Sequence, residues 1–177
     1  RQMLCTATAD GYFRRLDPAL AATLGHRVED LQARPFVEFV HPADREATLR
    51  ELAKLADGQP TLRFENRYRC KDGSYRWLAW TSIPQDEAGV LYATALDITE
   101  RKRAEELFRA ALESAPDAVL IVDMSGEMIL VNRVAETMFG YTRVELLGRP
   151  VEMLVPEAFR SQHAHNRRNY CADATVR

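Results

Sequence analysis

The sequence lacks the marks of several protein classes. Its 177 residues include only three cysteines, and no two of them form a Cys-x-x-Cys pair, so a structural zinc site is not indicated. No apolar run approaches the roughly 18 residues that span a bilayer, since the longest, residues 118–122, is as short as a strand. The 24 basic and 26 acidic residues leave a net charge of −2, which argues against non-specific nucleic-acid binding.

Catalytic and phosphate-binding motifs are absent as well. There is no Gly-x-Ser-x-Gly elbow, no Gly-x-x-x-x-Gly-Lys loop and no His-Glu-x-x-His pair, so we expect a chain that is not an enzyme. The hydrophobic fraction of 46% and the charged fraction of 28% describe a globular protein and exclude a disordered tail or a collagen. Cys5, Cys70 and Cys171 are widely spaced, which indicates reduced thiols in a cytoplasmic protein.

An internal repeat appears when the chain is shifted by 115 residues against itself. Residues 10–17 then align with residues 125–132, and the alignment continues without a gap. The positions that coincide are glycines, a proline, an arginine and apolar residues: Gly25 with Gly140, Leu31 with Leu146, Arg34 with Arg149, Pro35 with Pro150 and Val40 with Val155. Because such residues set backbone shape and core, the coincidence predicts two copies of one fold.

Each copy begins as a hairpin followed by short helices. In the second copy, residues 118–123 and 127–132 are predicted strands, and Gly126 supplies the positive φ of the turn between them. We expect helices at 18–24 and 28–32 in the first copy and at 133–139 and 143–147 in the second. Gly25 and Gly140 stand where helix C-caps belong.

The first copy continues into a helix and three strands. Asp44 is expected to cap a helix that runs to Ala56, with its apolar stripe at Leu49, Leu52, Ala53 and Ala56. The period then changes to two, which predicts a strand whose buried face carries Leu62, Phe64, Asn66, Tyr68 and Cys70. Further strands are predicted at 75–83, with Trp77 and Trp80 on opposite faces, and at 89–96. This order predicts an α+β fold, an antiparallel sheet with its helices on one face.

A helix is expected directly after this sheet. Asp97 and Glu100 have the spacing of a capping box. The apolar stripe of Ala104, Leu107 or Phe108, Ala111 and Ala115 indicates packing either on its own domain or on a second chain as a coiled coil. The helix, at residues 98–115, would link the two copies.

At these residues the sequence resembles a known family. Segments 66–78 and 97–102 resemble a PAS domain of bacterial sensor proteins, as do segments 39–45 and 132–150. The resemblance implies a five-stranded antiparallel sheet with short helices on one face around a small pocket. It divides the chain into a first PAS domain (1–97, its N-terminal cap missing), the linker helix (98–115) and the N-terminal part of a second PAS domain (116–177).

The resemblance also implies a regulatory function. The module would act upstream of a histidine kinase or a diguanylate cyclase output domain in the same chain, as a homodimer, and would respond to a small-molecule ligand or a redox stimulus. Asp97, Thr99 and Glu100 would transfer the signal from the last strand to the linker helix. The ligand pocket would be lined by hydrophobic residues of the first copy: Phe13, Leu24, Phe36, Phe39, Phe64, Tyr68 and Leu96.

Cofactors remain open at this stage. His163 lies in a stretch similar to the one that carries the iron ligand of haem-binding PAS oxygen sensors, although a polar surface histidine is the alternative. Trp77 and Trp80 would stack on FAD in a flavin redox sensor, or else belong to the sheet. A dimerisation scaffold with a filled core is the third alternative.

The second copy is expected to be incomplete. Residues after Ser114 provide its first two strands and its helices, but the last three strands of the first copy have no counterpart before Arg177. We therefore expect a window of about one and a half modules from a longer protein, with the second sheet completed beyond Arg177 or by strands of a partner.

Overall fold

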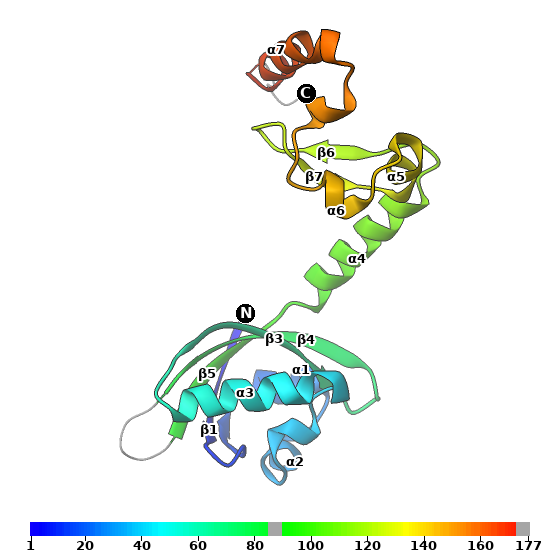
Figure 1. Cartoon of the computed structure of the whole chain (residues 1–177). Helices are drawn as coiled ribbons and strands as arrows, with labels where there is room; N and C mark the ends of the chain where they lie inside the picture. The colour runs from blue at the N-terminus through cyan, green and yellow to red at the C-terminus, as the bar shows by residue number, and fades with distance from the viewer. Residues whose placement is uncertain (85–89, 173–177) are drawn as a thin grey trace. The chain divides into compact units, whose positions relative to one another are not determined.

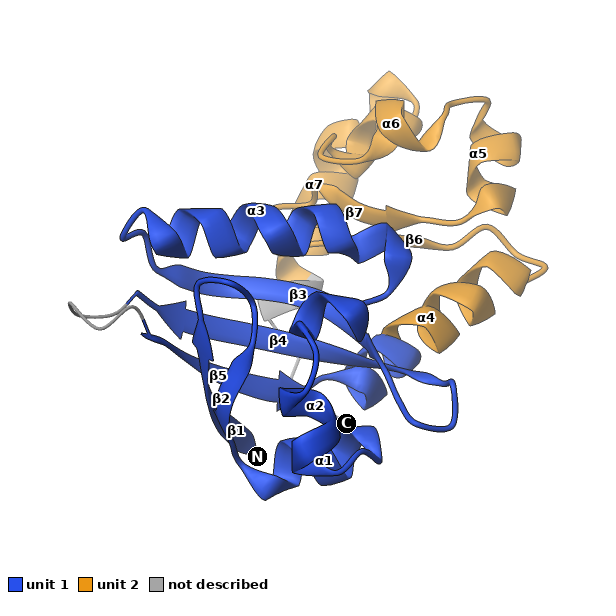
Figure 2. Cartoon of the chain, turned by 90° about the horizontal axis from the view of Figure 1, so that it is seen from below, with its two compact units in different colours: residues 1–104 blue, residues 105–177 orange. Residues whose placement is uncertain are grey.

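The computed structural model describes residues 1–84 and 90–172. The chain divides into two units, residues 1–104 and residues 105–177, which are coloured separately in Figure 2. The boundary falls within α4 (Thr99–Ser114), the helix that the sequence predicts after Asp97.

Unit 1 contains the predicted five-stranded antiparallel sheet. Its strands are β1 (Gln2–Thr8), β2 (Phe13–Leu16), β3 (Thr61–Arg69), β4 (Tyr75–Ile83) and β5 (Val90–Asp97), in the spatial order β2-β1-β5-β4-β3. Strand β4 has the bounds that the sequence predicts. The predicted start of the last strand, Gly89, lies outside the described residues.

The short elements between β2 and β3 cover one face of this sheet, as Figure 1 shows for the three α-helices. They are α1 (Pro18–Leu24), α2 (Val28–Gln32), η1 (Phe36–Glu38), η2 (Pro42–Asp44) and α3 (Arg45–Ala56). Asp17 caps α1 by accepting a hydrogen bond from the Ala19 amide (2.8 Å), and Gly25 ends it with a φ of 71°. The predicted capping and C-cap residues therefore fix α1.

Three expectations about α3 and β3 are wrong. In α3, Thr48 and Leu55 are buried, whereas Leu49, Ala53 and Ala56 are exposed, because the helix is rotated to bring Thr48 against β3. Asp44 stands at the N-cap position of α3, but its carboxylate binds Arg67 instead of the helix amides.

The third wrong expectation concerns the start of β3. A bulge between Thr61 and Phe64 shifts the register against β4. The bulge reverses the faces at its start, so Thr61 is buried and Leu62 is 76% exposed. Beyond the bulge the predicted alternation holds, because Asn66, Tyr68 and Cys70 are all buried.

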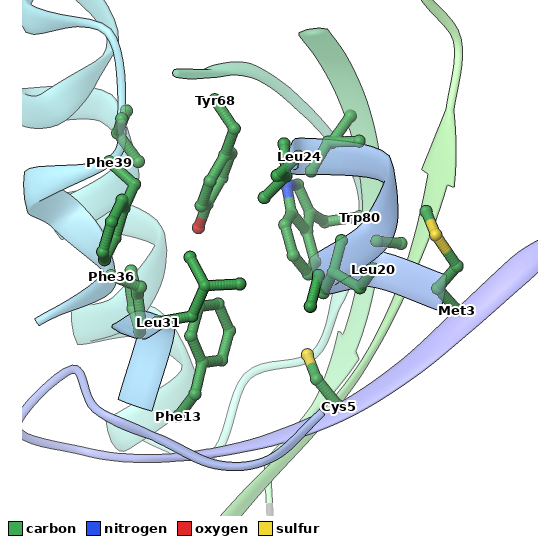
Figure 3. Packing of buried hydrophobic residues seen from close by; sticks show 14 of the residues in the cluster. Met3, Cys5, Phe13, Leu20, Leu24, Leu31, Phe36, Phe39, Tyr68 and Trp80 are labelled. Carbon is green, nitrogen blue, oxygen red and sulfur yellow. The ribbon is translucent and has the colours of Figure 1, made fainter. Parts of the chain in front are cut away.

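The core of unit 1 lies between the helices and the sheet. Figure 3 shows side chains from both layers pointing toward one another. The fully or almost fully buried members include Leu20, Leu24 and Leu31 from the helices and Cys5 and Leu78 from the strands. Burying such side chains is the main favourable term for this fold.

Unit 2 repeats the first half of this fold. It contains β6 (Leu120–Val122), β7 (Met128–Val131), α5 (Arg133–Phe139), α6 (Arg143–Leu146), η3 (Val151–Leu154), η4 (Glu157–Phe159) and α7 (Arg160–Ala172). Asn132 caps α5 through the Ala135 amide (3.0 Å), and Gly140 ends it with a φ of 73°. Within the described residues the sheet of this unit has two strands, as expected for an incomplete second copy.

The 115-residue offset persists into the last helix. The Nε atom of Arg45 donates to the Val40 carbonyl (3.1 Å), and the Nε atom of Arg160 donates to the Val155 carbonyl (2.9 Å). The glycine of the first turn is covered by the same helix in both units, by Leu52 over Gly11 and by Arg167 over Gly126. Residues 115 apart are therefore structurally equivalent from the first hairpin to α7.

Candidate functional site

A cavity of about 70 Å³ lies in unit 1 between α3 and the sheet. All five strands contribute to its wall. Most of the lining is apolar, and the polar side chains gather on α3, β3 and β4: Thr48, Glu51, Thr61, Asn66 and Ser82. A concave, largely apolar space with a few polar groups is the usual form of a small-molecule site.

Four of the seven residues predicted for the pocket line this cavity: Phe13, Phe36, Phe64 and Tyr68. Leu24 and Phe39 are buried in the same core but do not reach the cavity. Leu96 does not belong to it, because it follows the fully buried Ala95 on β5 and so points to the other face, where it is 38% exposed. The expectation for Leu96 is therefore wrong.

A chain of hydrogen bonds joins three residues that line the cavity, Trp80, Asn66 and Thr48. The Trp80 Nε1 donates to the Asn66 Oδ1 (2.8 Å), the Asn66 Nδ2 donates to the Thr48 Oγ1 (3.0 Å), and the Thr48 hydroxyl donates to the Asp44 carbonyl (2.8 Å). The sequence placed Asn66 on the inner face, but periodicity names no partners. The network ties α3 to β3 and β4 through groups whose burial would otherwise be costly.

The hydroxyl of Tyr68 is outside this network. Tyr68 is 3% exposed, and no hydrogen bond to its hydroxyl is present among the described residues. Figure 3 shows the hydroxyl pointing into the interior, among apolar side chains. Burial raises the pKa of Tyr68, and it also raises the pKa of the Cys5 thiol to about 12, so both groups stay protonated at neutral pH.

FAD does not fit this cavity. The Trp80 ring, one of the two predicted to stack on a flavin, packs on Tyr68 with 5.4 Å between ring centroids. The cavity is less than half of the roughly 150 Å³ that accommodates benzene in an engineered core, and an isoalloxazine is far larger than benzene. Trp77 lies on the opposite face of β4, as predicted.

The junction between β5 and α4 is built around Asp97. Its Oδ1 accepts hydrogen bonds from the amide (2.9 Å) and the hydroxyl (2.5 Å) of Thr99, and its Oδ2 accepts one from Arg76 (2.9 Å). Burial raises the pKa of Asp97, but these bonds outweigh it and hold the pKa below its usual value. The Thr99 hydroxyl in turn accepts from the Trp77 amide (3.0 Å), so the helix start is joined to β4.

Glu100 does not form the predicted capping box. Its carboxylate lies 2.9 Å from Arg103 on the next turn of α4, and both side chains are largely exposed. Of the three predicted signal-transfer residues, Asp97 and Thr99 therefore contact the sheet, and the contact recorded for Glu100 stays within the helix.

Trp77 forms a second connection to α4 that sequence reasoning missed. Two cations contact its ring, with the Arg67 Cζ 5.1 Å and the Lys102 Nζ 4.9 Å from its centroid. Lys102 also pairs with Glu65 on β3 (2.7 Å), as does Arg101 (2.7 Å). Cation–π and ionic contacts thus hold the first turn of α4 against the outer face of β3 and β4.

His163 lies on α7 in unit 2. Its Nδ1 is 3.1 Å from the Glu152 Oε1, which also accepts from the Arg167 Nε (3.1 Å). A carboxylate at Nδ1 is the partner that iron-ligating histidines commonly have, and it would leave Nε2 for a metal. Among the described residues, no group of three or more His, Cys, Asp and Glu side chains could hold a metal ion.

Two family models match the chain, and both are described as PAS fold. One covers residues 13–95 and the other residues 106–173. The chain therefore belongs to the PAS family, and it carries two PAS domains of a bacterial signalling protein.

Relatives with curated names come from sensory proteins. The chain is 29% identical to sensor protein FixL of Bradyrhizobium diazoefficiens over 139 residues, which are 72% of this chain and 28% of FixL. It is 32% identical to the probable diguanylate cyclase DgcE of Escherichia coli over 124 residues, which are 64% of this chain and 11% of DgcE. The chain thus spans less than a third of either relative.

One solved structure supports the fold. The N-terminal domain of a diguanylate cyclase with PAS/PAC sensor from Marinobacter aquaeolei matches with a TM-score of 0.51 and 18% identity, covering 58% of this chain and 99% of that domain. None of the helices in the described ranges combines the length and the hydropathy that a membrane crossing requires.

Proposed function

We propose that this segment is a regulatory module in which the first PAS domain binds a small molecule or registers a redox stimulus and α4 carries the response to an output domain. The main support for this proposal is that β3 and β4 both line the cavity and contact α4. On β3 and β4, the inward Asn66 and Trp80 alternate with the outward Arg67 and Trp77. A ligand that shifts these strands therefore changes the contacts that β3 and β4 make with the first turn of α4.

Asp97 and Thr99 are proposed as the main transfer residues, with Glu100 in a minor position on the exposed side. Support comes from the hydrogen bonds that join Asp97 to Arg76 and Thr99 to Trp77. A ligand can bias α4 only if it binds two arrangements of this junction with unequal affinity.

The output and the assembly of the parent protein are part of the proposal. A sensor histidine kinase is favoured because of FixL, and a diguanylate cyclase is the alternative because of DgcE. We propose a homodimer formed through α4, whose Leu107 and Phe108 are exposed, with residues 98–115 as the linker between domains at 1–97 and 116–177. The free thiols of Cys5 and Cys70 support the proposal that the protein is located in the cytoplasm.

The test is amide hydrogen exchange of α4 in the 177-residue chain with and without a cavity probe. Butan-2-one is a suitable probe because it has five non-hydrogen atoms and no charge. We expect altered exchange at residues 99–104 when the cavity-lining methyl groups report binding. Bound probe with unchanged exchange in α4 would contradict sensing and leave the dimerising scaffold.

A haem-based gas sensor in the second PAS domain is the second candidate, supported by the contact between the His163 Nδ1 and the Glu152 carboxylate (3.1 Å), which would leave Nε2 for iron. Haem would supply gas binding at its iron, and His163 would hold it. The test is haemin titration of the longer parent protein, followed by visible absorption. His163→Ala should abolish a Soret band that His165→Ala, which removes an exposed neighbour, retains. A colourless protein after haemin addition would exclude this candidate.

A further inference from the structure

The Tyr68 hydroxyl is a hydrogen-bond donor without a partner among the described residues, on a side chain that is 3% exposed and lines the cavity. Buried polar groups in native proteins are nearly always paired, because an unpaired donor keeps its full desolvation cost. Since Tyr68 lines the cavity, a molecule in that space is in position to accept the bond. The phenol stays protonated at neutral pH, so it offers a donor and not a negative charge.

The cavity wall provides no free charge. Among the described residues, Glu51 is the only charged residue that lines it, and its carboxylate already accepts from Lys54 (2.6 Å) and from the Thr61 hydroxyl (3.0 Å). No lysine, arginine or histidine in the described ranges lines the cavity. An anion would therefore lose its hydration without gaining a cationic partner, and this cost is large in an apolar interior.

The lining of the cavity limits the ligand as well. The space is only partly enclosed, so its lining, more than its volume, decides which class of molecule it takes. Phe13, Phe36 and Leu52 belong to its apolar lining, which favours a ligand that is mostly hydrocarbon.

We propose that the first PAS domain binds a small, uncharged, largely apolar molecule with one hydrogen-bond acceptor, and that this acceptor receives the proton of the Tyr68 hydroxyl. The proposal rests on the cavity being the sensory site proposed above, and it names the class of ligand for that site. Small ketones, aldehydes, ethers and alcohols belong to this class. Carboxylates, phosphates and amines do not.

The experiment uses three probes and three forms of the 177-residue chain. Butan-2-one carries the acceptor, propanoate is an anion with the same number of non-hydrogen atoms, and xenon is apolar without an acceptor. The forms are wild type, Tyr68→Phe and Tyr92→Phe, the last of which loses a hydroxyl from the solvent-exposed face of β5. Binding is followed by the methyl NMR signals of Leu52, Leu55 and Leu91, which line the cavity.

We expect butan-2-one to bind Tyr68→Phe about fivefold more weakly than wild type, the factor expected from one lost neutral hydrogen bond. Tyr92→Phe should bind it like wild type. Xenon should bind all three forms equally, which shows that the cavity of the variant is intact, and propanoate should shift none of the lining methyl groups. Equal ketone affinity in Tyr68→Phe, binding of propanoate at the same concentrations, or xenon binding without ketone binding would each overturn the proposal.

Failure here is distinguishable from failure of the proposed function. If a probe of another class binds and the exchange of α4 responds, the sensory role stands and the ligand class is wrong. If butan-2-one binds through Tyr68 and α4 does not respond, the ligand class stands and the sensory role is wrong.

Discussion

Replacement of Asp97 by alanine tests whether this carboxylate holds the start of α4. The variant removes the acceptor of the Thr99 amide and hydroxyl and the partner of Arg76. Loss of a helix cap costs about 0.5–2 kcal/mol, and the partly exposed ion pair adds about 0.5 kcal/mol. A total of about 1–2.5 kcal/mol makes opening of the first turn roughly 5- to 70-fold more frequent. The Ile98 amide still donates to the Trp77 carbonyl, so the effect should remain local.

Amide hydrogen exchange at residues 99–102 measures this opening directly. Asp17→Ala is the matched control, because it removes the same kind of cap from α1 in the same unit. It should raise exchange at Ala19 and leave α4 unchanged. Asp97→Asn keeps a capping acceptor and loses the charge, so it should fall between wild type and alanine. Wild-type exchange in Asp97→Ala, or faster exchange of α4 in the Asp17 variant, would refute the reasoning.

Three further outcomes are expected. Lys102→Gln should lower the free energy of unfolding of unit 1 by about 1 kcal/mol in urea, because the contacts with Glu65 and Trp77 are lost, while the exposed control Arg103→Gln should change it by less than about 0.5 kcal/mol. The hydrogen bond from Lys102 holds the pKa of Glu65 below its usual value, so this pair contributes above about pH 4, and the difference between wild type and Lys102→Gln should disappear as the pH falls through that lowered pKa. Arg167→Leu should destabilise unit 2 by about 2 kcal/mol, because Glu152 loses a partner in a site where both side chains are 14% exposed, and Arg168→Leu on the exposed side of α7 should have little effect.

The repeat and its capping residues made most of the fold predictable. Gly25 and Gly140 both have the left-handed conformation that ends a helix, and Asp17 and Asn132 both accept the capping hydrogen bond. Such signals are local. A left-handed backbone conformation favours glycine, and an unpaired amide in the first turn of a helix favours a side chain that accepts a hydrogen bond.

Two errors concern caps, since Asp44 and Glu100 contact arginines instead of helix amides, and the others concern which way one side chain points. Leu62, Leu96 and Leu49 were expected in the core, and all three are exposed. Along a strand, one residue of shift moves a side chain to the opposite face, and the bulge at the start of β3 causes such a shift. Sequence periodicity also could not predict that the Tyr68 hydroxyl lacks a hydrogen-bond partner. It indicates the face on which a residue lies, whereas a missing partner is recognised only when all the neighbouring residues are known.

The two domains share a backbone but differ in the chemistry of the same three positions. Thr48, Val37 and Leu52 in unit 1 correspond to His163, Glu152 and Arg167 in unit 2. In unit 1 they give a neutral wall, where Thr48 is joined to Asn66 and Leu52 covers Gly11.

In unit 2 the same positions hold an ionic cluster, and Arg167 covers Gly126 while its Nε binds Glu152. Charged groups so placed remain stable only when paired with one another or with a bound group. A neutral ligand of the kind proposed for Tyr68 would form no ionic contact with Glu152 or Arg167 in unit 2. A charged ligand would find no ionic partner among the described residues that line the cavity of unit 1. The two domains therefore share a backbone, while these three positions are neutral in unit 1 and include an ion pair in unit 2.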